Sequence, residues 1–304
     1  MRRLMKLLLA AALIGAAAFW FVTKPQTVPA SALAAPHTAH LANGKTMFDA
    51  GGCVSCHAPS KDDRTKLGGG IALTSPFGTF YTPNISSDSK DGIGGWSEAQ
   101  FVTAMSKGTS PKGEHYYPSF PYAAYQRMTI ADQRDLFAYL KTLPAVPGKA
   151  RDHDVPFPFN IRLALGGWKF LFLDGKPFTQ DAKQSAEWNR GAYLVNGLAH
   201  CAECHSPRNA LGSIVERQRF AGGPNPEGEG WIPNITQKAL AKWEVSDIAE
   251  LLKTGTTPEF DNVGGSMASV VRNTAQLSDA DRNAMAVYIK SLPAIDGPPR
   301  PEKR

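Results

Sequence analysis

The sequence is short of the features that mark several large protein classes. Its 304 residues hold only four cysteines, all within two copies of one pentapeptide, which leaves none for a disulfide framework. No basic stripe with interleaved aromatic residues occurs, so a nucleic-acid partner is excluded despite the net charge of +6. No segment alternates between apolar and polar residues long enough to predict a sheet. No catalytic dyad, nucleophile or metal cluster stands out above background.

The pentapeptide Cys-x-x-Cys-His occurs as Cys53-Val-Ser-Cys56-His57 and as Cys201-Ala-Glu-Cys204-His205. Two thiols at this spacing can form thioethers with the two vinyl groups of a porphyrin, and the following histidine can bind the iron. A redox dithiol or half of a zinc site shares the spacing, but the two pairs are far apart and both end in histidine. The sequence therefore predicts two covalently bound haem c groups, attached by Cys53, Cys56, Cys201 and Cys204, with His57 and His205 as axial iron ligands.

The sequence contains an internal repeat. Matching pairs are Cys53 and Cys201, Pro83 and Pro233, Trp96 and Trp243, and Leu143 and Leu292, with offsets of 148, 150, 147 and 149 residues. Such a small drift indicates duplication of a unit of roughly 105 residues. We therefore expect a first domain at 41–146, an inter-domain segment at 147–188, a second domain at 189–295 and a tail at 296–304.

Both units are expected to be helical. The predicted helices are 43–50, 98–107 and 130–142 in the first unit, and 189–196, 245–254 and 279–291 in the second. Gly108 and Gly255 follow the middle helices as stop signals. The order of helix, haem motif, long loop, helix, ligand loop and final helix resembles the class I cytochrome c fold. The predicted fold class is all-α, with two tandem class I cytochrome c domains after an N-terminal membrane anchor helix.

Residues 1–24 form a targeting segment. Three basic residues precede an apolar run from Leu7 to Val22, which is long for a signal-peptide core and slightly short for a bilayer span of about 20 residues. We favour an uncleaved inner-membrane anchor, with the N-terminus in the cytoplasm, residues 25–40 as an extended tether and the haem domains in the periplasm. The alternative is cleavage, for which an Ala-x-Ala site exists at 32–34, and which would leave the protein in the periplasm.

Each iron is also expected to have a sixth ligand, which in electron-transfer haems is commonly methionine or a second histidine. Met267 lies in a Gly-Gly-Ser-Met loop before the final helix, where a class I cytochrome c keeps its axial methionine. The equivalent residue of the first unit is Phe120, which cannot bind iron. Met128, which aligns with Leu277, and His115 are candidates there, and an open iron is the third possibility.

Two further segments carry weaker signals. Asn84-Ile-Ser and Asn234-Ile-Thr match the glycosylation sequon, but their recurrence at one place in both units predicts a structural role, such as hydrogen bonding near a haem edge. The inter-domain segment is strongly apolar from residue 161 to residue 173. A helix packed between the units is the simpler interpretation, and a docking face for a partner or the membrane is the alternative.

From about Leu41 to Ile295 the chain resembles the cytochrome c subunits of membrane-bound periplasmic dehydrogenases for alcohols, aldehydes and gluconate. Beyond the haem motifs, the stretches 188–194, 204–209 and 265–271 carry the likeness. The resemblance implies electron transfer from a dehydrogenase towards quinone, an oxidase or a small cytochrome. Those subunits usually carry three haems, and a methionine where this chain has Phe120.

An electron carrier is therefore favoured over an enzyme. The alternative is a dihaem enzyme or sensor of the peroxidase or thiosulfate-oxidising type, in which the first haem keeps an open face. Phe120 is the residue that supports this alternative, because it removes the expected methionine from the first unit.

Overall fold

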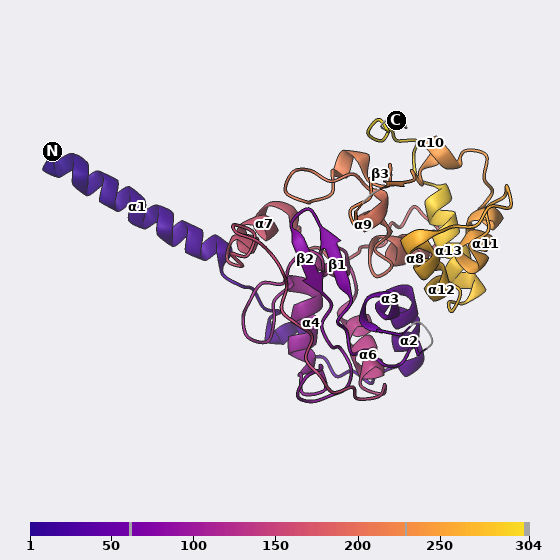
Figure 1. Ribbon diagram of the computed structural model, residues 1–304, viewed down its shortest axis with the longest axis horizontal. Helices are drawn as coiled ribbons and strands as arrows, with labels where there is room; N and C mark the ends of the chain where they lie inside the picture. The colour runs from indigo at the N-terminus through magenta and orange to yellow at the C-terminus, as the bar shows by residue number, and fades with distance from the viewer. Residues whose placement is uncertain (61–62, 229, 301–304) are drawn as a thin grey trace.

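A computed structural model describes residues 1–60, 63–228 and 230–300 of the chain, so part of the expected tail, 301–304, lies outside the described residues. One long helix projects from a body of two helical halves that lie side by side (Figure 1). This helix, α1 (Arg2–Thr23), is almost entirely exposed. Among the described residues it is the one helix long and apolar enough to cross a membrane.

The first domain contains α2 (Leu41–Ala50), α3 (Cys53–His57), α4 (Glu98–Lys107), α5 (Tyr122–Tyr125) and α6 (Ile130–Leu140). The second contains α8 (Ala186–Asn196), α9 (Cys201–His205), α10 (Gln237–Leu240), α11 (Val245–Thr254), α12 (Gly265–Thr274) and α13 (Asp279–Lys290). Between them lies α7 (Ala164–Phe172), and single 3₁₀ turns form at Ala30–Leu33 and Glu216–Gln218. The predicted helices 98–107 and 245–254 are confirmed at both ends, and the other four agree within three residues.

Local signals explain where these helices end. Gly108 and Gly255 both adopt the left-handed conformation, with φ of 58° and 81°, which closes α4 and α11 in the way glycine favours. Thr129 and Ser278 accept hydrogen bonds from the backbone N–H of Asp132 and Asp281, and so cap the final helices. These interactions span only a few residues, which is why the sequence predicted them.

Two short antiparallel ribbons correct the expectation that no strand forms. β1 (Ala72–Ser75) pairs with β2 (Gly78–Tyr81), and β3 (Gly223–Pro224) pairs with β4 (Trp231–Ile232). Strands of four and two residues are too short to show an alternating pattern. Two residues join β1 to β2, and six residues separate β3 from β4. The described residues are therefore mostly helical, with two short ribbons beside the helices.

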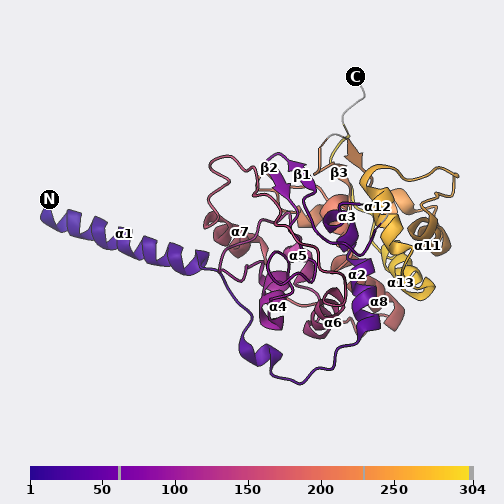
Figure 2. The ribbon, with the colours of Figure 1, turned by 60° about the horizontal axis from the view of Figure 1, so that its bottom comes forward.

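The first and last helices of each domain cross at a glycine. A Cβ atom on Gly44 in α2 would lie 2.2 Å from the carbonyl oxygen of Asp135 in α6. In the second domain, a Cβ atom on Gly191 in α8 would lie 1.8 Å from the carbonyl oxygen of Ala284 in α13. Backbones can approach this closely only where no side chain intervenes. Figure 2 shows α2 beside α6 and α8 beside α13, with α3 next to the first crossing.

Two elements differ from the expected loops. The stretch around Met267 is the first turn of α12 rather than a flexible loop. The expected tether at 25–40 lies against the first domain, where Arg134 donates to the carbonyl of Ala35 at 3.0 Å and Thr103 accepts from the N–H of Val28 at 3.2 Å. Both differences come from tertiary packing that local composition does not encode.

The helix crossing leads to a stability prediction. Gly191→Ala is expected to lower the free energy of unfolding by about 3 kcal/mol or more, because the new methyl group overlaps the backbone of Ala284. Gly167→Ala in α7 is the matched control, since no atom lies within 4 Å of its added Cβ. Its stability should stay constant or rise by about 0.5–1 kcal/mol, because alanine favours helix more than glycine does. Urea unfolding in detergent, followed by circular dichroism, measures both. Equal stabilities for the two variants would contradict the crossing.

Candidate haem sites

Each histidine of the two pentapeptides is held by a backbone carbonyl. His57 Nδ1 lies 2.8 Å from the carbonyl oxygen of Pro83, and His205 Nδ1 lies 2.9 Å from that of Pro233. A carbonyl can only accept, so the proton of each ring sits on Nδ1 and the lone pair on Nε2. Metal-binding histidines are oriented in this way, with the second nitrogen donating to a carbonyl.

The loops that carry these prolines are tied to the end of each domain by the two asparagines of the sequons. Asn84 donates to the carbonyls of Val146 and Gly148 at 2.7 and 2.9 Å, and Asn234 donates to that of Ile295 at 2.8 Å. Each asparagine oxygen also accepts the N–H two residues further on, at 2.9 and 2.8 Å. The recurring sequons thus have the structural role that their repetition predicted.

The thiols and imidazoles form the same donor set twice. No disulfide joins the four cysteines, and all four are half-buried. Burial raises the pKa of the first thiol of each motif to about 12 and of the second to about 11, so all remain protonated near neutral pH. Burial also lowers the pKa of His57 to about 4 and lowers that of His205. Two thiols and a neutral imidazole with a free Nε2 fit the attachment and axial ligation of a haem c.

The two motifs meet at the interface between the domains. Burial is the main cause of the raised pKa of Cys56 and of Cys204, and the negative charge of the Glu227 carboxylate is the second cause for both. Cys56 also contributes to the raised pKa of Cys204. The ring of His200, just before the second motif, lies near the backbone of Gly51, just before the first, and its centroid is 5.8 Å from that of Tyr125 in the first domain. One carboxylate therefore lies near the second cysteine of both motifs, which places the two sites next to each other.

Further contacts lock this interface. Asn273 in α12 donates to Ser55 Oγ at 2.7 Å and accepts from Arg64 at 3.1 Å. Ser55 is one of the two residues between the cysteines of the first motif. Tyr193 in α8 accepts the N–H of Thr129 at 3.1 Å and so joins the start of α6 to the second domain. The second domain thus braces the first haem motif directly.

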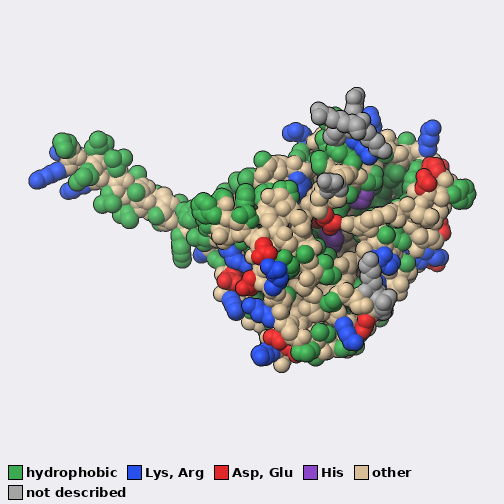
Figure 3. Space-filling view, in the orientation of Figure 1, with side chains coloured by type: hydrophobic (Ala, Val, Ile, Leu, Met, Phe, Trp, Pro, Cys, Tyr) green, Lys and Arg blue, Asp and Glu red, His purple; other side chains and the backbone are tan. Residues whose placement is uncertain are grey.

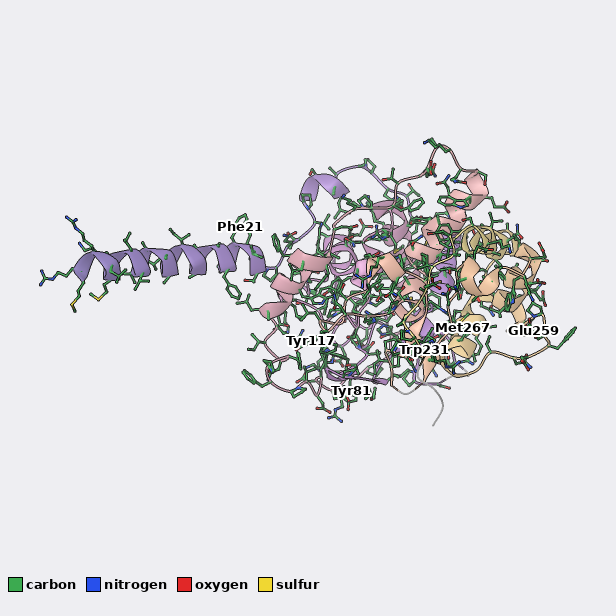
Figure 4. All side chains as sticks on the ribbon, turned by 90° about the horizontal axis from the view of Figure 1, so that it is seen from above. Phe21, Tyr81, Tyr117, Trp231, Glu259 and Met267 are labelled. Atoms are coloured by element: carbon green, nitrogen blue, oxygen red, sulfur yellow. The ribbon has the colours of Figure 1, made fainter. Side chains whose placement is uncertain are left out.

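Met267 lies in the first turn of α12, partly buried against the hydrophobic core. The neighbouring Ser266 hydrogen-bonds to Glu227, the same carboxylate that acts on Cys56 and Cys204. Met267 therefore belongs to the segment that covers the interface between the motifs. In Figure 4 it lies in the second domain, far across the body from Phe21 on α1.

Aromatic side chains surround the equivalent residue of the first domain. Phe120 makes edge contacts with the rings of Tyr116, Tyr122 and Tyr125, at centroid distances of 5.6, 6.3 and 5.5 Å. Met128 is 1% exposed and lies inside the core, as does the aligned Leu277 at 5%. The surroundings of Met128 are those of a packed core residue.

Both ring nitrogens of His115, the second candidate ligand of the first iron, are engaged elsewhere. Its Nε2 donates to the carbonyl of Thr23 at 2.7 Å, and its Nδ1 accepts from Lys169 Nζ at 3.0 Å. Burial lowers the pKa of His115, which agrees with the neutral ring that these two bonds require. His115 thus joins α1 to α7 in this structure.

Sequence reasoning missed several residues of the sites. Glu227, His200 and Lys169 act through contacts with segments far away along the chain, and no local pattern marks them. The proline carbonyls were detectable in principle, because Pro83 and Pro233 begin the recurring sequon segments.

Comparison with known proteins agrees with this geometry. The family model described as cytochrome c matches residues 41–144 and, a second time, residues 189–293. The chain belongs to the cytochrome c family. A protein of Cereibacter sphaeroides described as a dihaem c-type cytochrome is 49% identical over 300 residues, which cover 97% of this chain and all of that protein. The two matched domains and this relative support two covalently bound haem c groups.

Other relatives are subunits of dehydrogenases. The fructose dehydrogenase cytochrome subunit of Gluconobacter japonicus is 38% identical over 88% of this chain, and the gluconate 2-dehydrogenase cytochrome c subunit of Pantoea cypripedii is 34% identical over 83%. The chain spans 55% and 59% of those two proteins. It therefore matches somewhat more than half of each dehydrogenase subunit.

The loop contacts lead to a prediction for the proximal side. Asn84→Ala or Asn234→Ala is expected to lower the free energy of unfolding by about 2 kcal/mol, because buried carbonyls and N–H groups lose their partners. Asn283→Ala is the control, since its single bond to Glu187 is exposed. It should change stability by less than about 0.5 kcal/mol. Chemical unfolding of the purified protein measures all three, and a control as unstable as the loop variants would contradict this role.

Proposed function

We propose that this protein is a membrane-anchored periplasmic dihaem cytochrome c that transfers electrons from a dehydrogenase to the respiratory chain. One observation carries the proposal: two haem-attachment motifs, each in its own domain, meet at a single interface within one chain. A chain built in this way brings two redox cofactors together and leaves the outer faces of both domains for partners. The two haem domains are assigned to 41–146 and 189–295.

Different residues attach each haem covalently and bind its iron. Cys53 and Cys56 in the first domain, and Cys201 and Cys204 in the second, are the proposed covalent attachment points. His57 and His205 would bind the irons, and Met267 would supply the second protein ligand to the iron in the second domain. Each haem, when bound, supplies a one-electron iron couple. The chain keeps the imidazoles oriented through the proline carbonyls and excludes water through its buried core.

The donor and acceptor are inferred from the relatives. Several of these are the cytochrome subunits of fructose, gluconate and alcohol dehydrogenases. By this likeness, the donor is a periplasmic or membrane-bound dehydrogenase. The acceptor is quinone, an oxidase or a small cytochrome.

The N-terminal helix serves as an uncleaved anchor in the inner membrane, with the N-terminus in the cytoplasm. Thr23, its last residue, is 1% exposed and accepts a hydrogen bond from the buried His115. Cleavage at residues 32–34 would remove this partner of His115 and the backbone that packs against Gly166 in α7. The burial of Thr23 therefore supports retention of the helix.

A second candidate function is supported by the first domain. Phe120 stands where Met267 stands in the second domain, Met128 is enclosed in the core, and His115 has both ring nitrogens engaged. This arrangement favours an iron with an open distal face, which could bind peroxide or a small gas while the second haem supplies electrons. If the first iron is six-coordinate instead, Met128 is the proposed sulfur ligand.

The carrier proposal is tested by removing the second attachment site. Cys201→Ala with Cys204→Ala should lower the haem content from two per chain to one, because one set of thioethers is lost. In a strain that lacks the native chain, this variant should fail to restore oxygen uptake by membranes supplied with alcohols, fructose or gluconate. The wild-type chain at equal expression is the control. If membranes respire equally with and without the wild-type chain on every substrate, the dehydrogenase link is wrong.

The ligands are tested by electron paramagnetic resonance of the oxidised protein and by carbon monoxide added to the reduced protein. Met267→Leu is expected to create a high-spin signal and a new carbon monoxide complex, because it removes the sulfur ligand. Wild-type protein with two low-spin signals and no carbon monoxide complex would support the carrier, and Met128→Leu should then open the first iron. A high-spin signal and carbon monoxide binding in the wild type would support the second candidate function.

A further inference from the structure

The end of α1 is built into the first domain. The carbonyl of Thr23 accepts from His115 Nε2 at 2.7 Å, and α7 packs against the same turn. A Cβ atom on Gly166 in α7 would lie 2.4 Å from that carbonyl oxygen, so the two helices touch through their backbones. Figures 1 and 2 both show α7 at the foot of α1. The point where α1 meets the body is therefore a fixed junction.

The segment after α1 strengthens this junction. Val28 bonds to Thr103 in α4, and Ala35 bonds to Arg134 in α6. His37 Nε2 lies 2.7 Å from a carboxylate oxygen of Asp135, also in α6. Residues 25–40 therefore follow the surface of the first domain, and the body cannot swing freely on a long tether.

Exposed apolar side chains continue from the junction along α7 and the segment that precedes it. We call it the α7 patch: Phe157, Phe159, Ile161, Leu163, Phe170 and Leu171, which are 78, 44, 47, 43, 69 and 64% exposed. Figure 3 shows hydrophobic side chains gathered where α1 meets the body. Exposed apolar residues that cluster in this way mark an interaction surface.

The outer side of this segment is uncharged. Between residues 157 and 173 the only charged residues are Arg162 and Lys169. Arg162 donates to the carbonyl of His115 at 2.9 Å, and Lys169 is 9% exposed, with its ammonium group on the carbonyls of Lys107 and Gly108 at 2.7 and 2.6 Å. Both cations thus point into the domain, which leaves an aromatic and aliphatic outer face.

We propose that the α7 patch inserts into the headgroup and acyl boundary of the same bilayer that α1 spans. Continuity with α1 identifies lipid as the occupant, because the patch begins where the proposed membrane helix ends and carries no outward charge. Aromatic and aliphatic side chains are favoured at this depth of a bilayer. The inference rests on the proposed anchoring role of α1. With both α1 and the α7 patch attached to the bilayer, the first haem domain is held at the membrane surface in one orientation.

The test uses the full-length dihaem protein in nanodiscs of phosphatidylethanolamine and phosphatidylglycerol. Single nitroxide labels are placed on Leu171→Cys, on Leu13→Cys within α1, and on Phe260→Cys, an 87% exposed aromatic residue of the second domain. The native cysteines are consumed by haem attachment, so only the new thiol reacts. Each labelled protein is also measured in its oxidised form without either reagent, so that relaxation by the irons can be subtracted. Collisions with lipid-soluble oxygen and with a water-soluble nickel complex are then compared.

The label at position 171 is expected to collide with oxygen more often, and with the nickel complex less often, than the label at position 260. The label at position 13 is expected to behave like the label at position 171. A label at 171 that meets the nickel complex as often as the label at 260 overturns the inference while position 13 still supports the anchor. Protection of position 171 from both reagents would mean that protein covers the patch, which also overturns it. If position 13 itself meets the nickel complex, the proposed anchor fails and the inference falls with it.

Discussion

The crossing of the first and last helices at a glycine is the contact on which both haem sites depend. Gly44 and Gly191 let two backbones touch, so the start and the end of each domain are held together. The haem motif follows the first helix within a few residues, and its position is set by this crossing. The segment after the last helix then receives the hydrogen bonds of Asn84 or Asn234, which place the proline carbonyl against the histidine. The orientation of each imidazole therefore depends on the closure of the whole domain.

The two domains share this frame but differ in what packs on them. In the second, α12 presents Met267 and reaches across to Ser55 in the first motif. In the first, α7 supports the segment that contains Phe120, since the Lys169 ammonium lies 4.8 Å above the ring of Tyr122. The two domains therefore differ within an aligned segment, which holds Met267 in α12 of the second domain and Phe120 in the first, and only the first is supported by α7, which lies between the two matched ranges.

The Lys169 side chain shows how a buried charge is accommodated at the junction with α1. Burial lowers its pKa to about 7. Its three polar contacts are two carbonyls at the end of α4 and the Nδ1 of His115. The carbonyl end of a helix favours a cation, which offsets part of the cost of burial. The same ammonium holds His115 in the tautomer that binds the carbonyl of Thr23, so helix end, histidine and α1 form one network.

The sequence alone determined the two attachment motifs, the duplication and most helix boundaries, because thiol spacing, caps and glycine stops act over a few residues. It also identified the difference between Phe120 and Met267, since alignment of the two copies requires no structure. Only the tertiary structure decided that the motifs meet at one interface, that a proline carbonyl holds each histidine, and that His115 binds α1. It also revealed the short strands and the helix at Met267. These features join residues that are distant along the chain, and such contacts form only when packing brings the segments together.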